Sequence, residues 1–330
     1  MIPESKRAVV ERALKETLGA TDYEDIRILT EGLSSALVCR IEVRGCPYLL
    51  RIITRTDAAA DPTRQYECMR SAAKAGFAPR VLYSSIEDRI SITDFVDARP
   101  FPRGVAFDLL PNTIRAIHAL PRIAKSIDYL EAMDGFIHKF EAAALLPASE
   151  TQELFRLYAQ MRGIYGQDDS EIVLNHNDLK PENILYDGER VWLVDWEAAF
   201  MNDRNVDLAV VANFLVTNDA EERDLLHAYL GTPPSEFDLA RFFLMRQAVG
   251  VFYTVVFSLF GAGGKPIALN APVPDFRDYH DRIWAGEISL AGSEAKLDYA
   301  RVHRVQALEQ MRSSRFEEAL RIVAEGQGSA

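Results

Sequence analysis

The spacing of apolar residues changes along the chain, and the change predicts two parts. Residues 2–19 have the spacing of a charged amphipathic helix, and the apolar segments that follow up to Val96 alternate mainly in the manner of β-strands. From Gly104 onward the apolar residues recur mostly with a helical period. We therefore expect a small β-rich N-terminal lobe at residues 1–96 and a larger, mostly helical C-terminal lobe at residues 97–330.

Start and stop signals define individual helices within these parts. Asp61 and Pro62 have the residue types of an N-cap and a first helical position, and Gly76 is expected to end the helix that they begin. In the C-terminal lobe the periodicity predicts helices at residues 105–120, 152–165, 206–216, 220–230 and 237–260, and two more that begin at residues 294 and 315.

A β-hairpin is predicted inside the helical part. The apolar runs 183–186 and 191–194 are separated by an Asp-Gly pair at 187–188, which is a strong hairpin signal. Asn183 then begins one strand and Asp195 follows the other. Both side chains are therefore expected at the same end of the hairpin, and both carry oxygens of the kind that Mg²⁺ prefers.

Polar residues with the spacing His-x-Asp-x-x-x-x-Asn lead into this hairpin. Asp178 can accept the proton of an attacking hydroxyl, while Asn183 and Asp195 offer oxygens to Mg²⁺ on nucleotide phosphates. A lone Asp or Asn in a loop is more often a turn former, but here the run, the hairpin and the terminal Asp occur together. The combination indicates a kinase. His176 is expected to brace the loop, and Lys180 either to touch the transferring phosphate or to face solvent.

These motifs resemble those of the aminoglycoside phosphotransferase and choline/ethanolamine kinase superfamily, relatives of the protein kinases. Residues 176–183 are shared with protein kinases almost letter for letter. Residues 195–197 and 207–209, however, are similar to the small-molecule kinases' Asp-Trp-Glu and Asp-Leu-Ala, where a protein kinase has Asp-Phe-Gly and an activation segment. The resemblance covers residues 25–259. It implies an α+β, bilobal protein-kinase-like fold and an ATP- or GTP-dependent O-phosphotransferase that uses Mg²⁺.

Upstream segments extend the resemblance to the nucleotide site. Residues 29–38 resemble a short phosphate-covering loop, although Gly-x-Ser-Ser is also an ordinary turn. Arg51 lies in an apolar strand, where a buried cation needs an anion unless it faces water from an edge. Glu67 is the expected partner of Arg51, although an exposed helix Glu is the commoner arrangement. The backbone at 94–96 is expected to receive the adenine edge. The predicted nucleotide-binding residues are Gly32, Ser34, Ser35, Arg51, Glu67, Asp94, Phe95 and Val96.

The acceptor site is predicted from aromatic and acidic residues. Residues 242–260 are unusually aromatic, at about the place where choline kinases hold a quaternary ammonium, and aromatic faces attract cations. Aromatic residues at helical spacing are nevertheless core residues more often than ligand cages. Ala198 and Phe214 also depart from the choline-kinase pattern. The predicted acceptor-binding residues are Glu197, Asp203, Phe252 and Tyr253, for a small hydroxyl-bearing molecule that is cationic in the choline-like case.

Composition agrees with this assignment. The chain has 330 residues, 48% of them hydrophobic, which is enough for two lobes with cores. A formal charge of −12 argues against a nucleic-acid partner. Residues 248–264 are uncharged but shorter than the roughly 20 apolar residues that a membrane span requires. We expect no secretory signal, because the pattern at residues 2–19 is that of a charged amphipathic helix. We expect a soluble cytoplasmic protein without a membrane partner.

Two other classes of function remain open. A protein kinase needs a docking segment for peptides, for which the interval from Asp195 to Asp207 leaves little room. A non-catalytic nucleotide-binding protein would be expected to have lost Asp178 or a metal ligand, and the chain keeps all three. The acceptor, the choice between ATP and GTP and the oligomeric state stay open.

Overall fold

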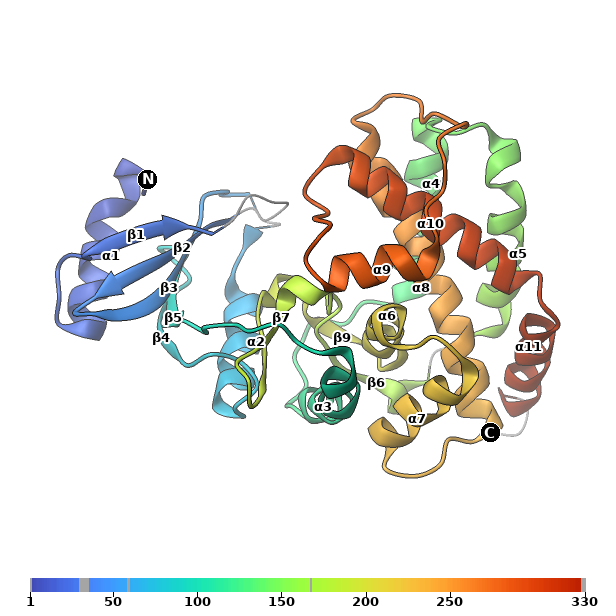
Figure 1. Cartoon of the computed structure of the whole chain (residues 1–330), viewed down its shortest axis with the longest axis horizontal. Helices are drawn as coiled ribbons and strands as arrows, with labels where there is room; N and C mark the ends of the chain where they lie inside the picture. Colours follow the sequence, from blue (N-terminus) through green and yellow to red (C-terminus); the bar gives the residue numbers. More distant parts are fainter. Residues whose placement is uncertain (1, 30–35, 58–59, 167, 328–330) are drawn as a thin grey trace. The chain divides into compact units, whose positions relative to one another are not determined.

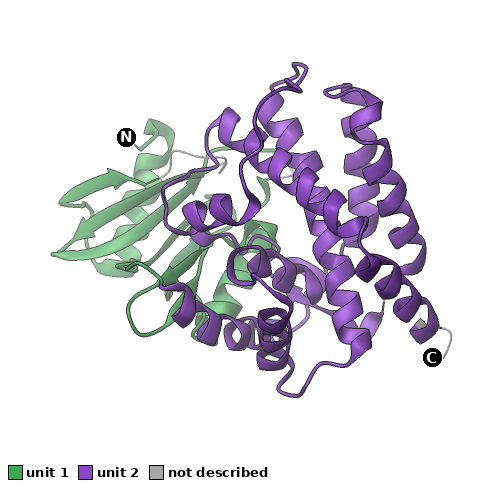
Figure 2. Ribbon diagram, turned by 45° about the vertical axis from the view of Figure 1, so that its right-hand side comes forward, with its two compact units in different colours: residues 1–101, 182–199 green, residues 102–181, 200–330 purple. Residues whose placement is uncertain are grey.

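The computed structural model describes residues 2–29, 36–57, 60–166 and 168–327, and the chain forms two compact units (Figure 2). Unit 1 contains residues 1–101 and 182–199, and unit 2 contains residues 102–181 and 200–330. The predicted hairpin thus groups with the N-terminal residues. The boundary predicted from the sequence, between residues 96 and 97, assigns it to the C-terminal lobe instead. Unit 1 is rich in strands and unit 2 is mostly helical, which confirms the α+β class.

Unit 1 is built on a five-stranded antiparallel sheet with the strand order β1-β2-β3-β5-β4 (Figure 1). The strands are β1 (Asp25–Ile28), β2 (Ala36–Val43), β3 (Cys46–Ile53), β4 (Val81–Ser85) and β5 (Ile90–Asp94). Successive residues of a strand face opposite sides. Leu50, Ile52, Ile90 and Ile92 accordingly share one side, where they pack in one apolar cluster with helix α1 (Glu4–Leu18). The other side of the sheet carries the polar residues Arg51 and Ser91 together with apolar residues such as Val38 and Ile53.

Helix α2 (Thr63–Lys74) follows the third strand of this sheet. The Asp61 carboxylate accepts hydrogen bonds from the Thr63 backbone N–H at 2.8 Å and from the Thr63 hydroxyl at 2.6 Å, which confirms the predicted capping role of Asp61. Just beyond the helix, Gly76 has a φ of 85°, in the left-handed region that glycine adopts readily. The buried face of α2 consists of Gln65, Tyr66, Cys68, Met69 and Ala72.

The predicted hairpin is present in unit 1 as β7 (Ile184–Tyr186) and β8 (Val191–Leu193). The Asp187 carboxylate shapes the connection, because it accepts hydrogen bonds from the backbone N–H groups of Glu189 and Arg190, both at 2.9 Å. The hairpin is also bonded to the rest of unit 1, since the Leu193 N–H donates to the Phe77 carbonyl at 2.7 Å.

Unit 2 consists of helices and one two-stranded sheet, β6 with β9. Its elements are α3 (Arg103–His118), α4 (Tyr129–Ala143), α5 (Gln152–Ile164), β6 (Ile172–Asn175), β9 (Phe200–Asp203), α6 (Asn205–Leu215), α7 (Asp219–Leu230), α8 (Glu236–Ala262), α9 (Phe276–Trp284), α10 (Ser293–Met311) and α11 (Ser314–Gln327). The predicted helices are all present, to within a few residues at their ends. The elements α4, α9, β6 and β9 were not predicted.

Helix α8 is the central helix of unit 2. It packs against α4, α5, α6, α10 and α11. In the described part of the chain it is the one helix long and apolar enough to cross a membrane. Of its apolar 18-residue stretch, 78% is buried inside the protein. This burial confirms that the stretch at 248–264 belongs to a core helix.

Candidate functional site

The two predicted metal ligands lie at one end of the hairpin in unit 1. Asn183 immediately precedes β7 and is buried, and its carbonyl accepts a hydrogen bond from the Val194 N–H at 3.0 Å. Asp195 follows with a φ of 64°, a left-handed conformation that Asp tolerates better than most residues. The backbone therefore holds an amide and a carboxylate at the same end. Two protein oxygens suit Mg²⁺, which usually keeps several waters and binds phosphates of the substrate.

A buried arginine neutralises the carboxylates at this end of the hairpin. Arg51 on β3 is 8% exposed. Its Nη1 lies 2.9 Å from Asp195 Oδ1, and its Nη2 lies 2.8 Å from Glu197 Oε2. Arg64 on α2 donates to the Glu197 carbonyl at 2.8 Å and so ties that helix to the same segment. The prediction of a buried cation with an anionic partner at position 51 is confirmed.

The predicted pairing of Arg51 with Glu67 is wrong. Glu67 is exposed on α2, and the carboxylates that Arg51 contacts are those of Asp195 and Glu197. Successive residues of a helix point about 100° apart, so the burial of Tyr66 turns Glu67 toward solvent. The sequence identifies the helix correctly, but not the residue on it that faces the sheet.

The predicted hinge begins where β5 ends. The Asp94 N–H donates to the Arg80 carbonyl at 3.0 Å, and the Asp94 carboxylate pairs with the Arg80 guanidinium. Within the described ranges, the backbone groups of Phe95 and Val96 form no hydrogen bond with other residues. They are thus free to pair with a base. The predicted phosphate-loop residues Gly32, Ser34 and Ser35 lie outside the described residues.

The proposed proton acceptor lies in a loop of unit 2. Asp178 follows Asn177, whose φ is 63°. Its Oδ2 is 3.0 Å from Lys180 Nζ, and both side chains are about one-third exposed, at 33% and 31%. The loop therefore presents a carboxylate and an ammonium together, the pair of charges that the sequence predicts for proton acceptance and phosphate contact.

A buried aspartate on α6 holds the start of this loop. Asp207 is fully buried, and its carboxylate accepts hydrogen bonds from the backbone N–H groups of His176 and Asn177, both at 2.7 Å. The same carboxylate lies 3.2 Å from His118 Nε2, and His118 Nδ1 lies 2.8 Å from the Tyr229 hydroxyl. Both ring nitrogens of His118 therefore have a polar neighbour. The role of Asp207 was not predicted.

Three asparagines complete the support of the loop. The Asn175 side chain donates to the Asn202 carbonyl at 2.9 Å and accepts from the Asp207 N–H at 3.3 Å. Asn202 in turn donates to Asn177 Oδ1 at 2.8 Å. His176 is buried next to them, with its N–H held by Asp207. The segment before Asp178 is thus hydrogen-bonded to β9 and α6. Among the side chains that form these bonds, Asp207 is the charged one.

Asp203 is an internal residue of unit 2, and the prediction that it binds the acceptor is wrong. Its side chain is 10% exposed, and its Oδ2 lies 2.9 Å from Arg241 Nη2 and accepts a hydrogen bond from the Tyr165 hydroxyl at 2.9 Å. Its Oδ1 accepts from the Asn205 N–H at 2.8 Å. The guanidinium of Arg241 also lies over the Tyr165 ring, 4.2 Å from its centroid. The carboxylate of Asp203 therefore neutralises the buried Arg241 of α8.

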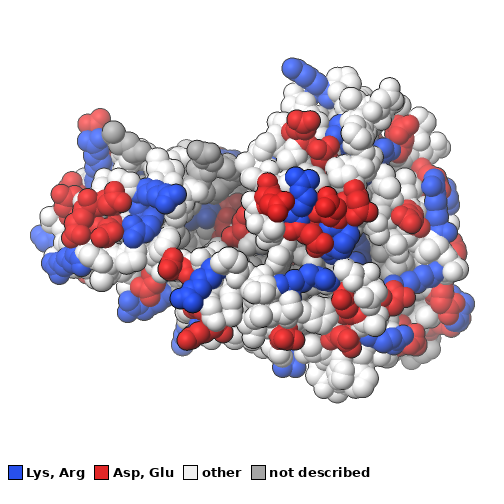
Figure 3. Space-filling model, viewed as in Figure 1, with Lys and Arg blue, Asp and Glu red and all other residues white. Residues whose placement is uncertain are grey.

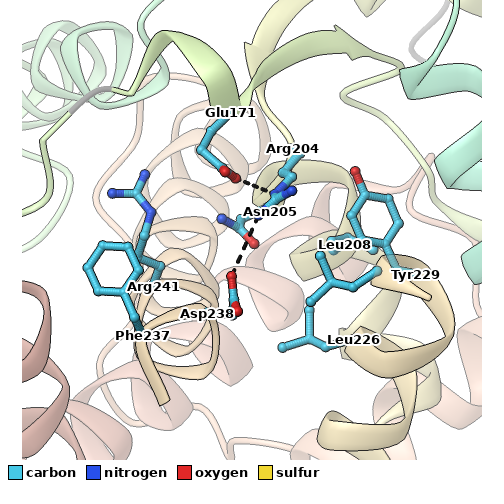
Figure 4. Close-up of a pocket in the computed structure, with 10 residues that line it drawn as sticks. Glu171, Arg204, Asn205, Leu208, Leu226, Tyr229, Phe237, Asp238 and Arg241 are labelled. Atoms are coloured by element: carbon cyan, nitrogen blue, oxygen red, sulfur yellow. Dashed lines mark ion pairs between the residues drawn. The ribbon is translucent and has the colours of Figure 1, made fainter. Parts of the chain in front are cut away.

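A small cavity adjoins Arg241, and its charges are likewise balanced internally (Figure 4). Arg204 forms ion pairs with Glu171 and, at 3.6 Å, with Asp238. Burial raises the pKa of the Glu171 carboxyl, while Arg204 opposes this rise. Leucines of α6 and α7 and Phe237 supply the apolar part of the lining.

The two predicted aromatic residues of the acceptor site have different surroundings. Tyr253 is 8% exposed and packs in the core against Tyr299 and His303, with ring centroids 5.3 and 4.9 Å away. Burial raises the pKa of the Tyr253 hydroxyl, and the charges of Asp178 and Asp207 raise it further. Phe252 is only half-buried, and its ring packs against those of Tyr129 and Phe136.

Charges of both signs are interspersed over the face of the protein in Figure 3. Exposed ion pairs occur in both units, such as Arg12 with Asp88 in unit 1 and Arg312 with Glu153 in unit 2. Exposed pairs of this kind contribute little to stability, about 0–1 kcal/mol each.

Comparisons with known proteins agree with this geometry. The model of the phosphotransferase enzyme family matches residues 25–242. A search of curated proteins finds no match. Among solved structures, a choline/ethanolamine kinase family protein from Mesorhizobium loti has a TM-score of 0.68 and 22% sequence identity, and the match covers 96% of this chain and 99% of that chain.

Two further solved structures share the fold at lower identity. Choline kinase LicA from Streptococcus pneumoniae has a TM-score of 0.57 and 16% identity, over 86% of this chain and 98% of that chain. APH(2″)-IIa, solved in a ternary complex with streptomycin and ATP, has a TM-score of 0.56 and 13% identity, over 76% of this chain and 90% of that chain. Such identities establish a common kinase-like fold, and a fold alone does not specify a substrate. Since the family model spans well over half of its residues, the chain belongs to the phosphotransferase enzyme family.

Proposed function

We propose that the protein transfers the terminal phosphoryl group of ATP or GTP to a hydroxyl of a small molecule. The observation that carries the proposal is the hairpin end in unit 1, where Asn183 and Asp195 lie beside the buried cation Arg51. An amide, a carboxylate and a guanidinium are the groups that a magnesium nucleotide needs. Asp178 precedes Asn183 by five positions in the sequence and supplies the carboxylate that accepts the proton of the acceptor hydroxyl.

Each residue has a separate task in this proposal. Asp178 takes the proton of the acceptor hydroxyl, whose oxygen forms a bond to the γ-phosphorus while the bond from that phosphorus to the β-γ bridging oxygen breaks. Lys180 and Arg51 offset negative charge on the phosphates. Asn183 and Asp195 hold Mg²⁺, which when bound neutralises phosphate charge. Positioning and charge account for most of the catalysis, because phosphoryl transfer needs little covalent chemistry from the protein.

The nucleotide base is assigned to the hinge. Phe95 and Val96 have backbone groups that no other described residue bonds, whereas the Asp94 N–H is already used by Arg80. A free N–H and a free C=O are what a purine edge requires, and either adenine or guanine offers complementary groups. Ser34 and Ser35, with Gly32, are assigned to the phosphates on the sequence alone.

For the acceptor we propose a small cation bearing a hydroxyl, such as an amino alcohol or an aminoglycoside. Phe252 is half-buried and offers part of a ring face, and Glu197 retains 42% side-chain exposure despite its ion pair. Aromatic faces and carboxylates both attract cations. Tyr253 backs the Phe252 ring from the core. The similar solved structures include choline kinases and an enzyme in complex with streptomycin, which fits this class of acceptor.

Turnover of ATP and of GTP across a panel of acceptors tests the proposal. The panel contains choline, ethanolamine, thiamine and aminoglycosides, with a generic protein substrate as the alternative class of acceptor. We expect magnesium-dependent product formation with at least one small alcohol. Phosphorylation of the protein substrate alone indicates a protein kinase, and nucleotide binding without any turnover indicates a non-catalytic binder. We further propose that the enzyme is soluble and cytoplasmic, which its buried α8 supports.

A further inference from the structure

A fully buried tyrosine, Tyr66, lies on the helix that is bonded to the partners of Arg51, since Arg64 of α2 donates to the Glu197 carbonyl at 2.8 Å and the Glu197 carboxylate lies 2.8 Å from Arg51. Arg51 on β3 and Ser91 on β5 are directly opposite each other in the register of the sheet, so their side chains point to the same side. This is the side away from α1, since Leu50, Ile52, Ile90 and Ile92 occupy the side that α1 covers. Arg51 and Ser91 are both buried, with 8% and 2% exposure. Polar groups thus line a buried layer beneath the nucleotide site.

Helix α2 contributes Tyr66 to this layer. Tyr66 has 0% exposure and is among the largest fully buried side chains of the protein. Burial raises the pKa of Tyr66 to about 12, while the Ser91 hydroxyl and the Arg51 guanidinium act in the opposite direction. Both groups therefore lie close enough to the phenol to influence it. At neutral pH the hydroxyl stays protonated and uncharged.

The Tyr66 hydroxyl has no well-aligned hydrogen bond among the described residues. A buried hydroxyl without a partner costs about 1–3 kcal/mol, and a phenylalanine would fill the same space without that cost. The presence of a hydroxyl at this depth therefore calls for a polar partner, and a guanidinium is a group that can donate N–H hydrogen bonds to it.

We propose that Tyr66 is the residue of α2 that positions Arg51 for the nucleotide phosphates. The inference rests on the proposed function, in which Arg51 contacts those phosphates. In the structure Arg51 is paired with Asp195 and Glu197. With Asp195 holding a metal ion, Arg51 would have one carboxylate partner fewer, and the phenol oxygen of Tyr66 would accept an N–H of Arg51 and keep the guanidinium in place for the phosphates.

An uncharged acceptor has an advantage over a carboxylate in this position. Arg51 already has two carboxylate partners, and a third would neutralise the charge that the phosphates need. A phenol oxygen orients the guanidinium and leaves its charge intact. Glu67, the neighbouring residue on α2, faces solvent and does not compete for Arg51.

The substitution Tyr66→Phe tests this role, because it removes the hydroxyl and keeps the ring. We expect the dissociation constant of a non-hydrolysable ATP or GTP analogue to rise about 10-fold, in line with the loss of a hydrogen bond to a charged group. The KM for nucleotide should rise with it, while the KM for the acceptor should not change. Tyr83→Phe is the matched control, since the Tyr83 hydroxyl contacts Asp88 in the same unit at 3.4 Å.

A double-mutant cycle with Arg51→Met separates positioning from packing. If Tyr66 acts through Arg51, Tyr66→Phe should change nucleotide affinity less than about twofold in the Arg51→Met background. An unchanged nucleotide affinity of Tyr66→Phe, or an equal loss in both backgrounds, would overturn the inference. If Arg51→Met weakens the nucleotide and Tyr66→Phe does not, only the role of Tyr66 fails. If Arg51→Met binds nucleotide normally, the proposed use of Arg51 fails as well.

Discussion

The candidate nucleotide- and metal-binding residues of unit 1 and the loop of Asp178 in unit 2 are held in place in different ways. In unit 1 the functional groups hold one another, since Arg51 pairs with Asp195 and Glu197 through side chains that are 10%, 20% and 42% exposed. In unit 2 the Asp207 carboxylate is buried and holds the backbone of His176 and Asn177. The first arrangement consists of ion pairs between side chains, and the second consists of hydrogen bonds to the chain itself.

This difference predicts how each region responds to ligands and to mutation. Arg51 is buried, so its charge needs an anionic partner, and phosphate oxygens can serve in place of Asp195 or Glu197 when a nucleotide binds. A buried backbone N–H that loses its acceptor costs about 1–3 kcal/mol. We therefore expect substitutions in unit 1 to change ligand binding, and substitutions around Asp207 to change stability and the placement of Asp178.

The largest effect is expected from Asp195→Asn. The variant keeps a side chain that tolerates the left-handed backbone at φ 64° but removes the anionic metal ligand. Magnesium-dependent nucleotide affinity and turnover should fall together, turnover by about 10³-fold, because charge on the triphosphate is left uncompensated. Thermal unfolding should change little. Normal magnesium-dependent affinity in this variant would remove Asp195 from the metal site, and Asp187→Asn in the hairpin turn serves as the control.

Asp178→Asn should cost about 10²-fold or more in turnover while nucleotide affinity is retained. The side chain is assigned to the acceptor hydroxyl, and a carboxamide cannot take its proton. The Lys180 ion pair at 3.0 Å is lost as well, which is a small effect at one-third exposure. Single-turnover measurements and nucleotide titrations separate the two quantities. Near-normal turnover would show that the proton acceptor lies elsewhere.

Asp207→Asn tests how unit 2 holds the loop of Asp178. The carboxamide has one oxygen where two backbone N–H groups need acceptors, so we expect the free energy of unfolding to fall by about 1–3 kcal/mol. Turnover should also fall, because the backbone before Asp178 is released, while nucleotide affinity stays normal. Urea unfolding measures the first effect, with the exposed Asp219→Asn as control. A stable variant with weakened nucleotide binding would contradict the division between the units.

Acid should act on unit 2 selectively, since the six histidines of the chain all lie there. Burial lowers the pKa of His280 to about 3 and holds the pKa of His303 well below its ordinary value. Between pH 6.5 and about 3 the unfolded chain binds a proton at His280 that the folded chain does not bind. Stability is therefore complete above pH 6.5 and falls as the pH decreases, by about 1.4 kcal/mol per pH unit for one such histidine.

Urea unfolding at pH 7 and pH 5 measures this dependence. His280→Gln should lessen the difference between the two pH values, because the amide does not titrate, whereas the exposed His138→Gln should leave it unchanged. An equal acid sensitivity in the His280→Gln variant would show that other groups control it.

Local signals in the sequence predicted much of this molecule. The hairpin at 184–193, the cap at Asp61 and the long helices follow from turn chemistry and periodicity, which neighbouring residues determine. The missed elements are short or weakly patterned, such as β6 and β9 with four residues each and α9 with nine. The Asp128 cap of α4, which accepts from the Leu130 and Glu131 N–H groups, was a usable signal.

Partners that are distant in the sequence could not be predicted. Which residue of α2 faces Arg51 depends on the rotation of that helix against the sheet, and a one-residue difference decides between Tyr66 and Glu67. The ion pair between Asp203 and Arg241 depends on the packing of α8, because the two residues are 38 positions apart in the sequence. Asp207 did carry a signal, since it is a charged residue in an apolar helical stretch, where burial requires hydrogen bonds.

The smallest expected effect concerns the acceptor and uses Phe252→Leu. Tyr253→Ala is a poor probe, because Tyr253 is a core residue and its truncation would cost stability in any case. The half-buried Phe252 has a ring that can meet a cation, and its replacement by leucine keeps the volume and removes the π face. If the acceptor is cationic, its KM should rise roughly 2- to 5-fold, corresponding to about 0.5–1 kcal/mol, and should also rise with salt. Phe260→Leu, at the exposed end of the same helix, is the matched control. A neutral or anionic acceptor, or a Phe252→Leu variant altered only in thermal stability, would leave the aromatic face of α8 as core and move the acceptor site away from it.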